Sequence, residues 1–264
     1  MDNTSTENGR PADISRGTLR DMLHTYADAV LPVVSTNADG DEGIGTAFHI
    51  GEGVFVTARH VVEGMSDVHV ILNAQSLPGD ILRTRPNEFD RFERHAVSAH
   101  FHNDSTIDVA VFRIERYSFL PAIPLGGHLD DWINDRDFLL NEVLVIGYPP
   151  IPFTFEPIQI ATRGHVAGVA DLRQAKHVHF VLSVMARGGF SGGVVFSEWN
   201  VALGIVTMSL LKDGLPEELG YLTVLSVEPI LQCLEQNGMM TEELRGVWGE
   251  LFVDTGDRVT LDDE

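Results

Sequence analysis

Gly189-Phe190-Ser191-Gly192-Gly193 is the stretch of sequence that decides the fold. It is read together with two others, Thr57-Ala58-Arg59-His60-Val61-Val62 and Ile107-Asp108-Val109-Ala110-Val111. A serine hydroxyl is a poor nucleophile at neutral pH, so it needs an imidazole to take its proton and a carboxylate to hold that imidazole in the right tautomer. The three stretches supply these groups in the order His60, Asp108, Ser191, which predicts a base, an orienting carboxylate and a nucleophile.

The histidine follows a predicted β-hairpin. Residues 44–50 and 53–58 are both alternating runs, and a glycine-rich turn lies between them. Two alternating runs joined by such a turn are typical of an antiparallel hairpin. His60 therefore lies just beyond the end of a strand.

These stretches resemble the trypsin-like serine proteases of the chymotrypsin fold, in particular the bacterial intracellular type. The hairpin is similar to the one that delivers the histidine in bacterial members, and the resemblance covers roughly residues 31–237. It implies an all-β protein with two six-stranded antiparallel Greek-key barrels and with helices at both ends. The His-Asp-Ser order agrees with this family. The stretches that resemble strands of the second barrel are residues 143–149, 161–169, 204–209 and 220–224.

The resemblance also divides the chain into three parts. We expect a polar N-terminal segment and helix over 1–30, the protease domain over 31–238, and a helical extension with an acidic tail over 239–264. Apolar residues of 15–30 recur at helical spacing, and Pro32 is expected to end that helix.

The protease domain itself is expected to contain three units. The first barrel covers about 31–125, the second barrel about 142–226, and a closing helix 228–237. The closing helix has Pro229 in its first turn, where a proline is well tolerated.

Composition limits the partners and the compartment. The net charge of −21 argues against nucleic acid, because the phosphates would be repelled. No stretch is long and apolar enough to cross a bilayer, and the first thirty residues lack the apolar run of a secretory signal. Cys233 is the only cysteine, so an internal disulfide is excluded, as is usual in reducing compartments. We expect a cytoplasmic bacterial protein with neither a membrane nor a nucleic acid as its partner.

The resemblance implies the mechanism of a serine endopeptidase, which needs no cofactor. Ser191 attacks a peptide carbonyl, His60 carries the proton to the leaving amine, Asp108 orients His60, and water hydrolyses the acyl-enzyme. The developing oxyanion is expected to bind the backbone amides of Gly189 and Ser191. Because Gly188 makes the preceding loop more permissive, a further hypothesis is that this oxyanion hole is misformed at rest and ordered by substrate or a partner.

Four residues are expected to bind the polypeptide substrate. By resemblance, Met185 forms the floor of the specificity pocket and Gly220 leaves one wall open. Thr207 is expected to place a hydroxyl near the catalytic carboxylate and to bind substrate through its carbonyl. Ser209 is expected to pair with an extended substrate as an added strand. A methionine cannot pair with Lys or Arg, so an apolar P1 side chain is predicted.

Two residues depart from the family pattern. Phe190 stands where digestive members have the aspartate that pairs with a newly cut N-terminal amine, so activation by such an amine is not expected. We expect Phe190 to anchor the loop by burial instead. Arg59, beside His60, is expected to face solvent, with a contact to Glu63 or to substrate as the other interpretation.

Other functions stay open at this point. The main alternative is a catalytically latent, protease-like binding or regulatory module that needs an activating protein partner; Phe190 and the permissive glycines favour it, and the complete triad argues against it. An esterase is disfavoured because esterases usually have another fold and another chain order. The pairs His100/His102 and His177/His179 could each offer two imidazoles, yet no cysteine or carboxylate accompanies them at ligand spacing, so no metal site is expected.

Overall fold

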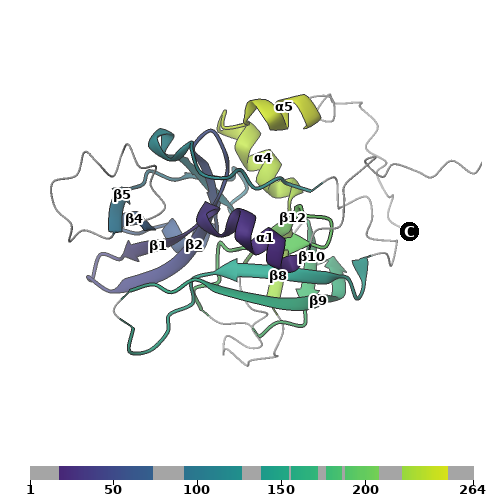
Figure 1. Ribbon diagram of the computed structural model, residues 1–264. Coiled ribbons are helices and arrows are strands. Elements are labelled where there is room, and N and C mark those ends of the chain that lie inside the picture. Colours follow the sequence, from purple (N-terminus) through teal and green to yellow (C-terminus); the bar gives the residue numbers. More distant parts are fainter. Residues whose placement is uncertain are drawn as a thin grey trace, which may run out of the picture.

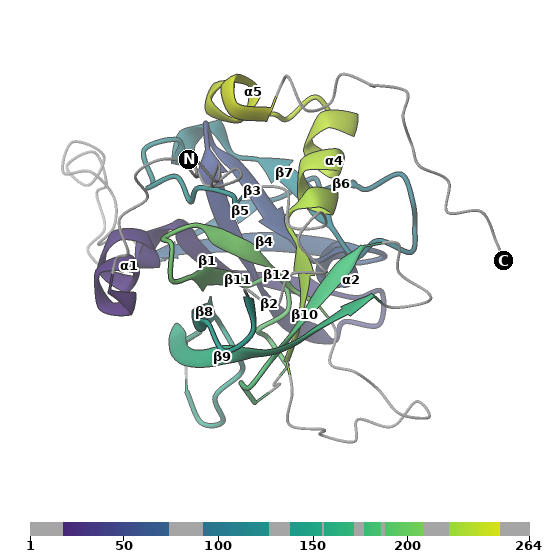
Figure 2. The same ribbon diagram turned by 90° about the vertical axis from the view of Figure 1, so that its right-hand side faces the viewer.

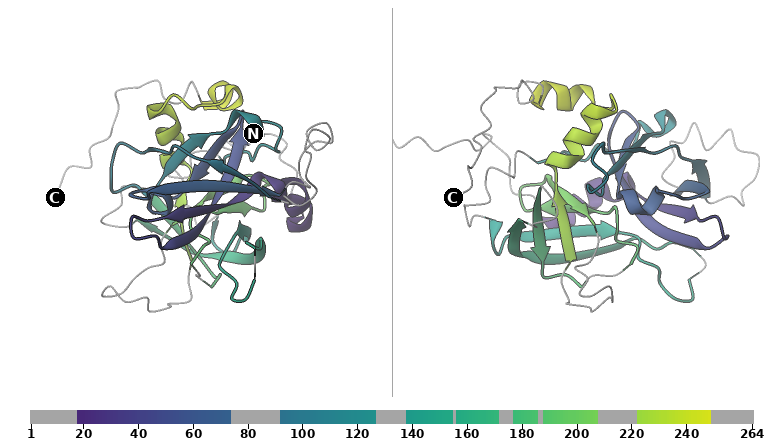
Figure 3. Two further views of the ribbon diagram at one scale, coloured as in Figure 1. Left: turned by 90° about the vertical axis from the view of Figure 1, so that its left-hand side faces the viewer. Right: turned by 180° about the vertical axis from the view of Figure 1, so that it is seen from behind.

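Two antiparallel β-sheets carry the described part of the chain. The structure is a computed structural model, and it describes residues 18–73, 92–126, 138–154, 156–171, 177–185, 188–207 and 222–248. The sheets lie side by side, with α4 (Glu228–Gln236) and α5 (Glu242–Trp248) above them (Figure 1). The view from behind shows the same arrangement (Figure 3).

The first sheet has the strand order β5-β4-β1-β2-β3-β7-β6. The β2–β3 hairpin forms where the alternating pattern predicts it, and its turn contains Gly53 at φ +73°. A Cβ on Gly53 would collide with the carbonyl oxygen of Ile114, so only glycine fits this turn. The strands are β1 (Val30–Thr36), β2 (Glu42–Gly51), β3 (Val54–Thr57), β4 (Asp67–Asn73), β5 (Phe92–Ala96), β6 (His100–Phe101) and β7 (Ala110–Arg113).

The segment from β5 to β6 connects the two edges of this sheet. β5 pairs with β4, and after residues 97–99 the chain pairs with β7 through β6. Counted as one bent strand, this segment gives the sheet six strands, and such bends are how strands turn the corners of barrels. The expected first barrel is therefore present as a half-barrel whose edges are joined by the chain itself.

The second sheet is a closed barrel with the order β10-β13-β12-β11-β8-β9. All residues of β11, β12 and β13 are buried, so these strands form the apolar core on which the nucleophile loop rests. The predicted all-β, two-barrel fold class is confirmed. The strands are β8 (Glu142–Gly147), β9 (Ile160–Asp171), β10 (Val178–Leu182), β11 (Val194–Ser197), β12 (Ala202–Val206) and β13 (Leu222–Ser226).

Short helices flank the sheets. The first is α1 (Leu19–Tyr26), capped by the Thr18 hydroxyl, which accepts from the Asp21 amide at 3.2 Å. It continues into the 3-10 helix η1 (Ala27–Ala29). Later in the chain come α2 (Arg59–Val62) and η3 (Glu115–Tyr117), and α4 lies against β7 (Figure 2). None of the helices within these described ranges is long and apolar enough to cross a membrane.

The prediction that Pro32 ends the first helix is wrong. The helix ends earlier, at Tyr26, and Pro32 lies inside β1, where it pairs in register with Thr46 of β2. The β-branched residues around it, Val30 and Val33, favour a strand. A proline is tolerated there because Thr46 bonds elsewhere through both its N–H and its C=O.

The N-terminal helix is held against the second barrel. Tyr26 stacks on Phe196 of β11, with ring centroids 5.2 Å apart. The Tyr148 hydroxyl donates to the Val30 carbonyl at 3.0 Å, and burial raises the pKa of Tyr148 to about 12, so it stays a donor at neutral pH. The Gln159 amide donates to the Ala27 carbonyl at 2.8 Å. These contacts fix both ends of the loop 148–159 to the start of β1.

His49 makes the fold sensitive to acid. Its Nδ1 bonds the Pro121 carbonyl at 3.0 Å and its Nε2 accepts from the Gly53 amide at 2.9 Å, so the buried ring is neutral. Burial lowers the pKa of His49 below its ordinary 6.5. As pH falls below about 6.5, His49 becomes protonated in the unfolded chain but stays neutral in the native protein. The free energy of unfolding therefore falls by up to about 1.4 kcal/mol per pH unit.

Urea unfolding between pH 5 and 8 measures this dependence. His49→Gln should be less stable at every pH. Below about pH 6.5 its free energy of unfolding should depend less steeply on pH than that of the parent, because one titrating group has been removed. An identical slope in the variant and the parent would show that His49 is not the group responsible.

Candidate active site

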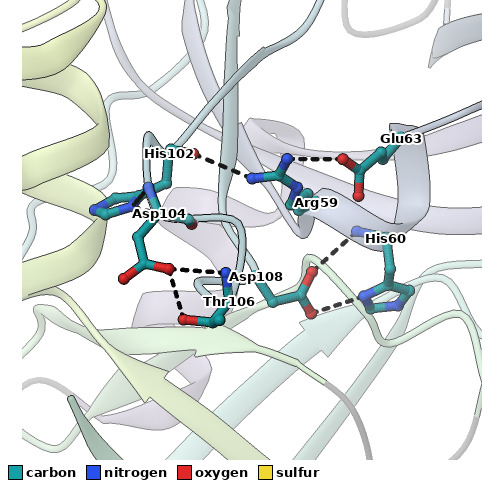
Figure 4. A network of polar contacts seen from close by, with 7 residues as sticks. All are labelled: Arg59, His60, Glu63, His102, Asp104, Thr106 and Asp108. Carbon is teal, nitrogen blue, oxygen red and sulfur yellow. Dashed lines mark hydrogen bonds and ion pairs between the residues drawn. The ribbon is translucent and has the colours of Figure 1, made fainter. Parts of the chain in front are cut away.

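His60 and Asp108 form a paired hydrogen bond. His60 lies in α2, three residues after β3 ends, and Asp108 lies in the loop between β6 and β7. The ring Nδ1 lies 2.7 Å from Asp108 Oδ2, and the His60 backbone N–H donates to Oδ1 at 2.9 Å (Figure 4). An ionised carboxylate only accepts hydrogen bonds. Nδ1 therefore carries the proton, and Nε2 is left as an acceptor that can work as a base.

Both side chains keep some contact with solvent. The imidazole of His60 is 39% exposed and the carboxylate of Asp108 is 23% exposed. The partial exposure of the imidazole leaves it accessible to a substrate.

Ser191 lies on a loop that is tied to strands of the second barrel. The Gly192 amide donates to the Val206 carbonyl at 2.8 Å, and the Gly193 amide donates to the Phe190 carbonyl at 2.7 Å. Phe190 is only 3% exposed, and its ring packs at Gly147, where a Cβ would lie 2.8 Å from it. The expectation that Phe190 anchors the loop by burial is confirmed.

Two glycines bring this loop close to other backbone. Gly189 has φ +86°, and a Cβ on it would lie 2.6 Å from both the Tyr148 carbonyl oxygen and Pro149 Cα. Gly192 has φ +82°, and its Cβ would meet the Thr46 carbonyl oxygen and, at 3.0 Å, the Ala58 amide. The nucleophile loop therefore lies directly against the strand end that leads into His60.

Ser191 and His60 are brought to the same region without a direct bond. Within the described ranges no hydrogen bond joins the Ser191 hydroxyl to His60 Nε2. Catalytic hydrogen bonds are often long in ligand-free sites and tighten only when substrate binds.

A family model described as a trypsin-like peptidase domain matches residues 45–205. The chain belongs to this family. The match begins inside β2 and ends inside β12, so it contains His60, Asp108 and Ser191. Membership in the trypsin-like peptidase family supports a serine protease, as the resemblance predicted.

Solved structures show the same fold. An HtrA-type protease, AlgW with tripeptide, is 20% identical with a TM-score of 0.60, and the match covers 84% of this chain and 64% of that one. The serine endoprotease from Yersinia pestis is 19% identical with a TM-score of 0.57, covering 84% and 67%. The Rv3671c protease in its inactive form is 18% identical with a TM-score of 0.55, covering 83% and 93%.

These likenesses have limits. The chain spans slightly less than two thirds of the length of the AlgW structure, at 64%. No curated protein gives a significant match.

Arg59 does not face solvent. Its side chain is 14% exposed and donates to Glu63 at 2.7 Å and to the His102 carbonyl at 3.1 Å (Figure 4). The expected contact with Glu63 is confirmed, and it raises the pKa of Arg59. The guanidinium also lies 4.9 Å from the centre of the Phe101 ring. Arg59 thus links the helix that carries His60 to the loop that leads to Asp108.

The helix α4 holds the other side of that loop. Gln232 bonds His102 Nε2 at 3.2 Å, and Gln236 accepts from the Asn103 amide at 2.9 Å. Beneath this contact Cys233 is fully buried, and burial raises the pKa of its thiol to about 12. Cys233 is therefore an inert part of the core at neutral pH.

The expected substrate residues are only partly described. Met185 is 56% exposed, and Thr207 is buried with its amide donating to the Thr223 carbonyl at 3.3 Å. Among the described atoms no hydrogen bond joins the Thr207 hydroxyl to Asp108. Ser209 and Gly220 lie outside the described residues. The specificity pocket stays a prediction.

The paired histidines have other roles in the described segments. His102 contacts α4, and His179 Nδ1 bonds the His177 carbonyl at 3.0 Å. Across those segments, no group of three or more His, Cys, Asp or Glu side chains is arranged to hold a metal ion.

Sequence reasoning missed Thr46, a neutral residue in the middle of β2 that contacts the nucleophile loop. Its only signal is its place in the hairpin that carries the histidine.

Proposed function

We propose that this chain is a serine endopeptidase that cleaves polypeptides through an acyl-enzyme, with Ser191, His60 and Asp108 as its triad. The observation that carries the proposal is the double hydrogen bond to Asp108, from the ring and the backbone N–H of His60. This arrangement leaves one ring nitrogen as a base, directed by a carboxylate, near the glycine-rich loop that carries Ser191. It favours nucleophilic catalysis over a purely structural role.

The proposed reaction has two steps, acylation of Ser191 and hydrolysis of the acyl-enzyme. Ser191 Oγ forms a bond to the substrate carbonyl carbon while its proton moves to His60 Nε2, and electrons move onto the carbonyl oxygen. When the C–N bond breaks, the imidazolium gives that proton to the leaving amine. Water then attacks the ester carbonyl and gives a proton to His60. His60 passes that proton to Ser191 Oγ as the acyl C–O bond breaks and the acid leaves. Asp108 stays ionised throughout and stabilises the imidazolium.

The oxyanion is proposed to bind the amides of Gly189 and Ser191. Neither amide donates a hydrogen bond to any other described residue, so both are available. Preorganised donors of this kind act on charge that develops only in the transition state, and losing one typically costs about 10²–10³ in rate.

An apolar P1 side chain is proposed from Met185. This exposed thioether cannot pair with a basic side chain, and it lies six residues before the nucleophile. Cleavage of a mixed peptide library should fall after Ala, Val, Leu or Met. Predominant cleavage after Lys or Arg would contradict the assignment of this pocket.

A fluorophosphonate probe at pH 7.5 tests the proposed function. The intact protein should be labelled, and Ser191→Ala should not, because the probe bonds only to an activated serine. Equal labelling of both proteins would place the reactive group elsewhere and overturn the triad. Labelling of neither, in folded protein, would overturn the proposal and favour the latent regulatory module.

A further inference from the structure

Thr46 belongs to the first barrel but bonds the nucleophile loop of the second. It lies in β2 and is fully buried. Its backbone N–H donates to the Ser191 carbonyl at 2.9 Å, and its hydroxyl donates to the Gly189 carbonyl at 2.8 Å. Both residues whose amides are proposed to bind the oxyanion are therefore held by one threonine.

The hydroxyl of Thr46 makes two hydrogen bonds, one as a donor and one as an acceptor. Besides donating to Gly189, it accepts a hydrogen bond from the Tyr148 amide at 2.9 Å. Tyr148 and Pro149 form the wall that a Cβ on Gly189 would strike. The hydroxyl thus holds Gly189 and the wall behind it in a fixed relation.

Thr46 is itself fixed in place. Its carbonyl accepts from the Thr57 hydroxyl at 2.7 Å, and Thr57 is the last residue of β3, just before the helix of His60. The strand partner in register is Pro32, which has no amide hydrogen to compete for that carbonyl. The first barrel therefore presents Thr46 to the loop in a single orientation.

A glycine with positive φ has the greatest freedom to move away from an active conformation, because no side chain restrains it. At Gly189 the restraint comes from its carbonyl, since the residue cannot rotate without breaking the bond from Thr46. A buried carbonyl without a hydrogen-bond donor destabilises the folded protein, so the structure favours keeping this bond.

We propose that Thr46 is a positioning residue whose hydroxyl holds Gly189 in the conformation that lets its amide bind the oxyanion. The inference rests on the proposed function of the same site. Thr46 does not touch the substrate, so its effect is on turnover through Gly189.

Three variants test this role at a temperature well below each unfolding midpoint. Thr46→Val keeps the shape and removes the hydroxyl, and Thr46→Ser keeps the hydroxyl. Thr241→Val is the control, because it removes a buried hydroxyl that bonds the Leu244 amide rather than the nucleophile loop. On an internally quenched peptide with an apolar P1 residue, Thr46→Val should lower kcat by about 10- to 100-fold with KM within twofold. Thr46→Ser should stay within threefold of the parent, as should Thr241→Val despite its lower unfolding midpoint.

A second readout needs no turnover. In ¹⁵N spectra the Gly189 amide resonance should shift or broaden in Thr46→Val and stay near its parental position in Thr46→Ser. An unchanged kcat or an unchanged Gly189 resonance in folded Thr46→Val would overturn the inference. Equal losses of kcat in Thr46→Val and Thr241→Val would also overturn it, because the effect would then come from a general loss of stability. If the parent itself is not labelled by fluorophosphonate, the proposed function fails, and the Gly189 resonance alone decides the role of Thr46.

Discussion

Replacing Asp108 by asparagine should lower kcat by about 10⁴ while the protein stays folded. Asp108 accepts from two donors, the ring Nδ1–H and the backbone N–H of His60. An asparagine oxygen can still accept from the backbone, and its NH₂ group then faces Nδ1. Nδ1 must become the acceptor, so the ring proton moves to Nε2, where it blocks removal of the Ser191 proton.

The rate constant for fluorophosphonate labelling and the hydrolysis of fluorescent casein both measure this loss. Asp104→Asn is the matched control, because Asp104 lies in the same loop and bonds Thr106 rather than His60 (Figure 4). It removes the same charge and should stay within a few fold of the parent. A folded Asp108→Asn protein within tenfold of the parent would show that this carboxylate does not direct the base.

Replacing Gly189 by alanine should lower activity by about 10²–10³ through loss of one oxyanion donor. The added Cβ would lie 2.6 Å from the Tyr148 carbonyl oxygen and from Pro149 Cα. An alanine at φ +86° is also strained, at a cost of about 1–3 kcal/mol. The loop can relieve both problems only by turning the residue, which moves its amide away from the oxyanion.

Its neighbour offers a sharp comparison. A Cβ on Gly188 meets nothing within 4 Å, so Gly188→Ala should change the free energy of unfolding by less than about 0.5 kcal/mol. Labelling rates and urea midpoints of the two variants separate the effects. Full labelling of Gly189→Ala would contradict the proposed oxyanion hole, and a large loss in Gly188→Ala would mean that loop flexibility itself is required.

The residues with distinctive chemistry could be found from the sequence. His60, Asp108 and Ser191 each lie in a short apolar or glycine-rich pattern, and local patterns fix the strand ends on which they lie. The burial of Phe190 was predictable for the same reason, since an aromatic side chain in a glycine-rich loop has little else to stabilise it. Their roles as a triad stay a prediction until the labelling experiment is done.

The residues that hold the site together could not be found in this way. Thr46 and Gly189 are 143 positions apart, and no local pattern relates a strand threonine to a distant glycine. The burial of Arg59 could not be predicted because its partners, the Phe101 ring and the His102 carbonyl, come from β6 and the residue after it, more than forty positions away. Pro32 was wrongly predicted to end a helix because prolines often do so. Here it lies in a strand opposite Thr46, where no amide hydrogen is needed from it.

The order of strands in the second barrel also affects when the site can form. β13 is the last strand in the part of the chain that the structure describes, and it pairs on both sides, with β10 and β12. During synthesis, the ~35 residues from Ser191 to Ser226 take roughly 2–7 s to add, and over that interval the barrel lacks one wall. A growing chain therefore contains Ser191 before the strand that closes its barrel exists, so the proposed nucleophile gains its final surroundings only after β13 has been made.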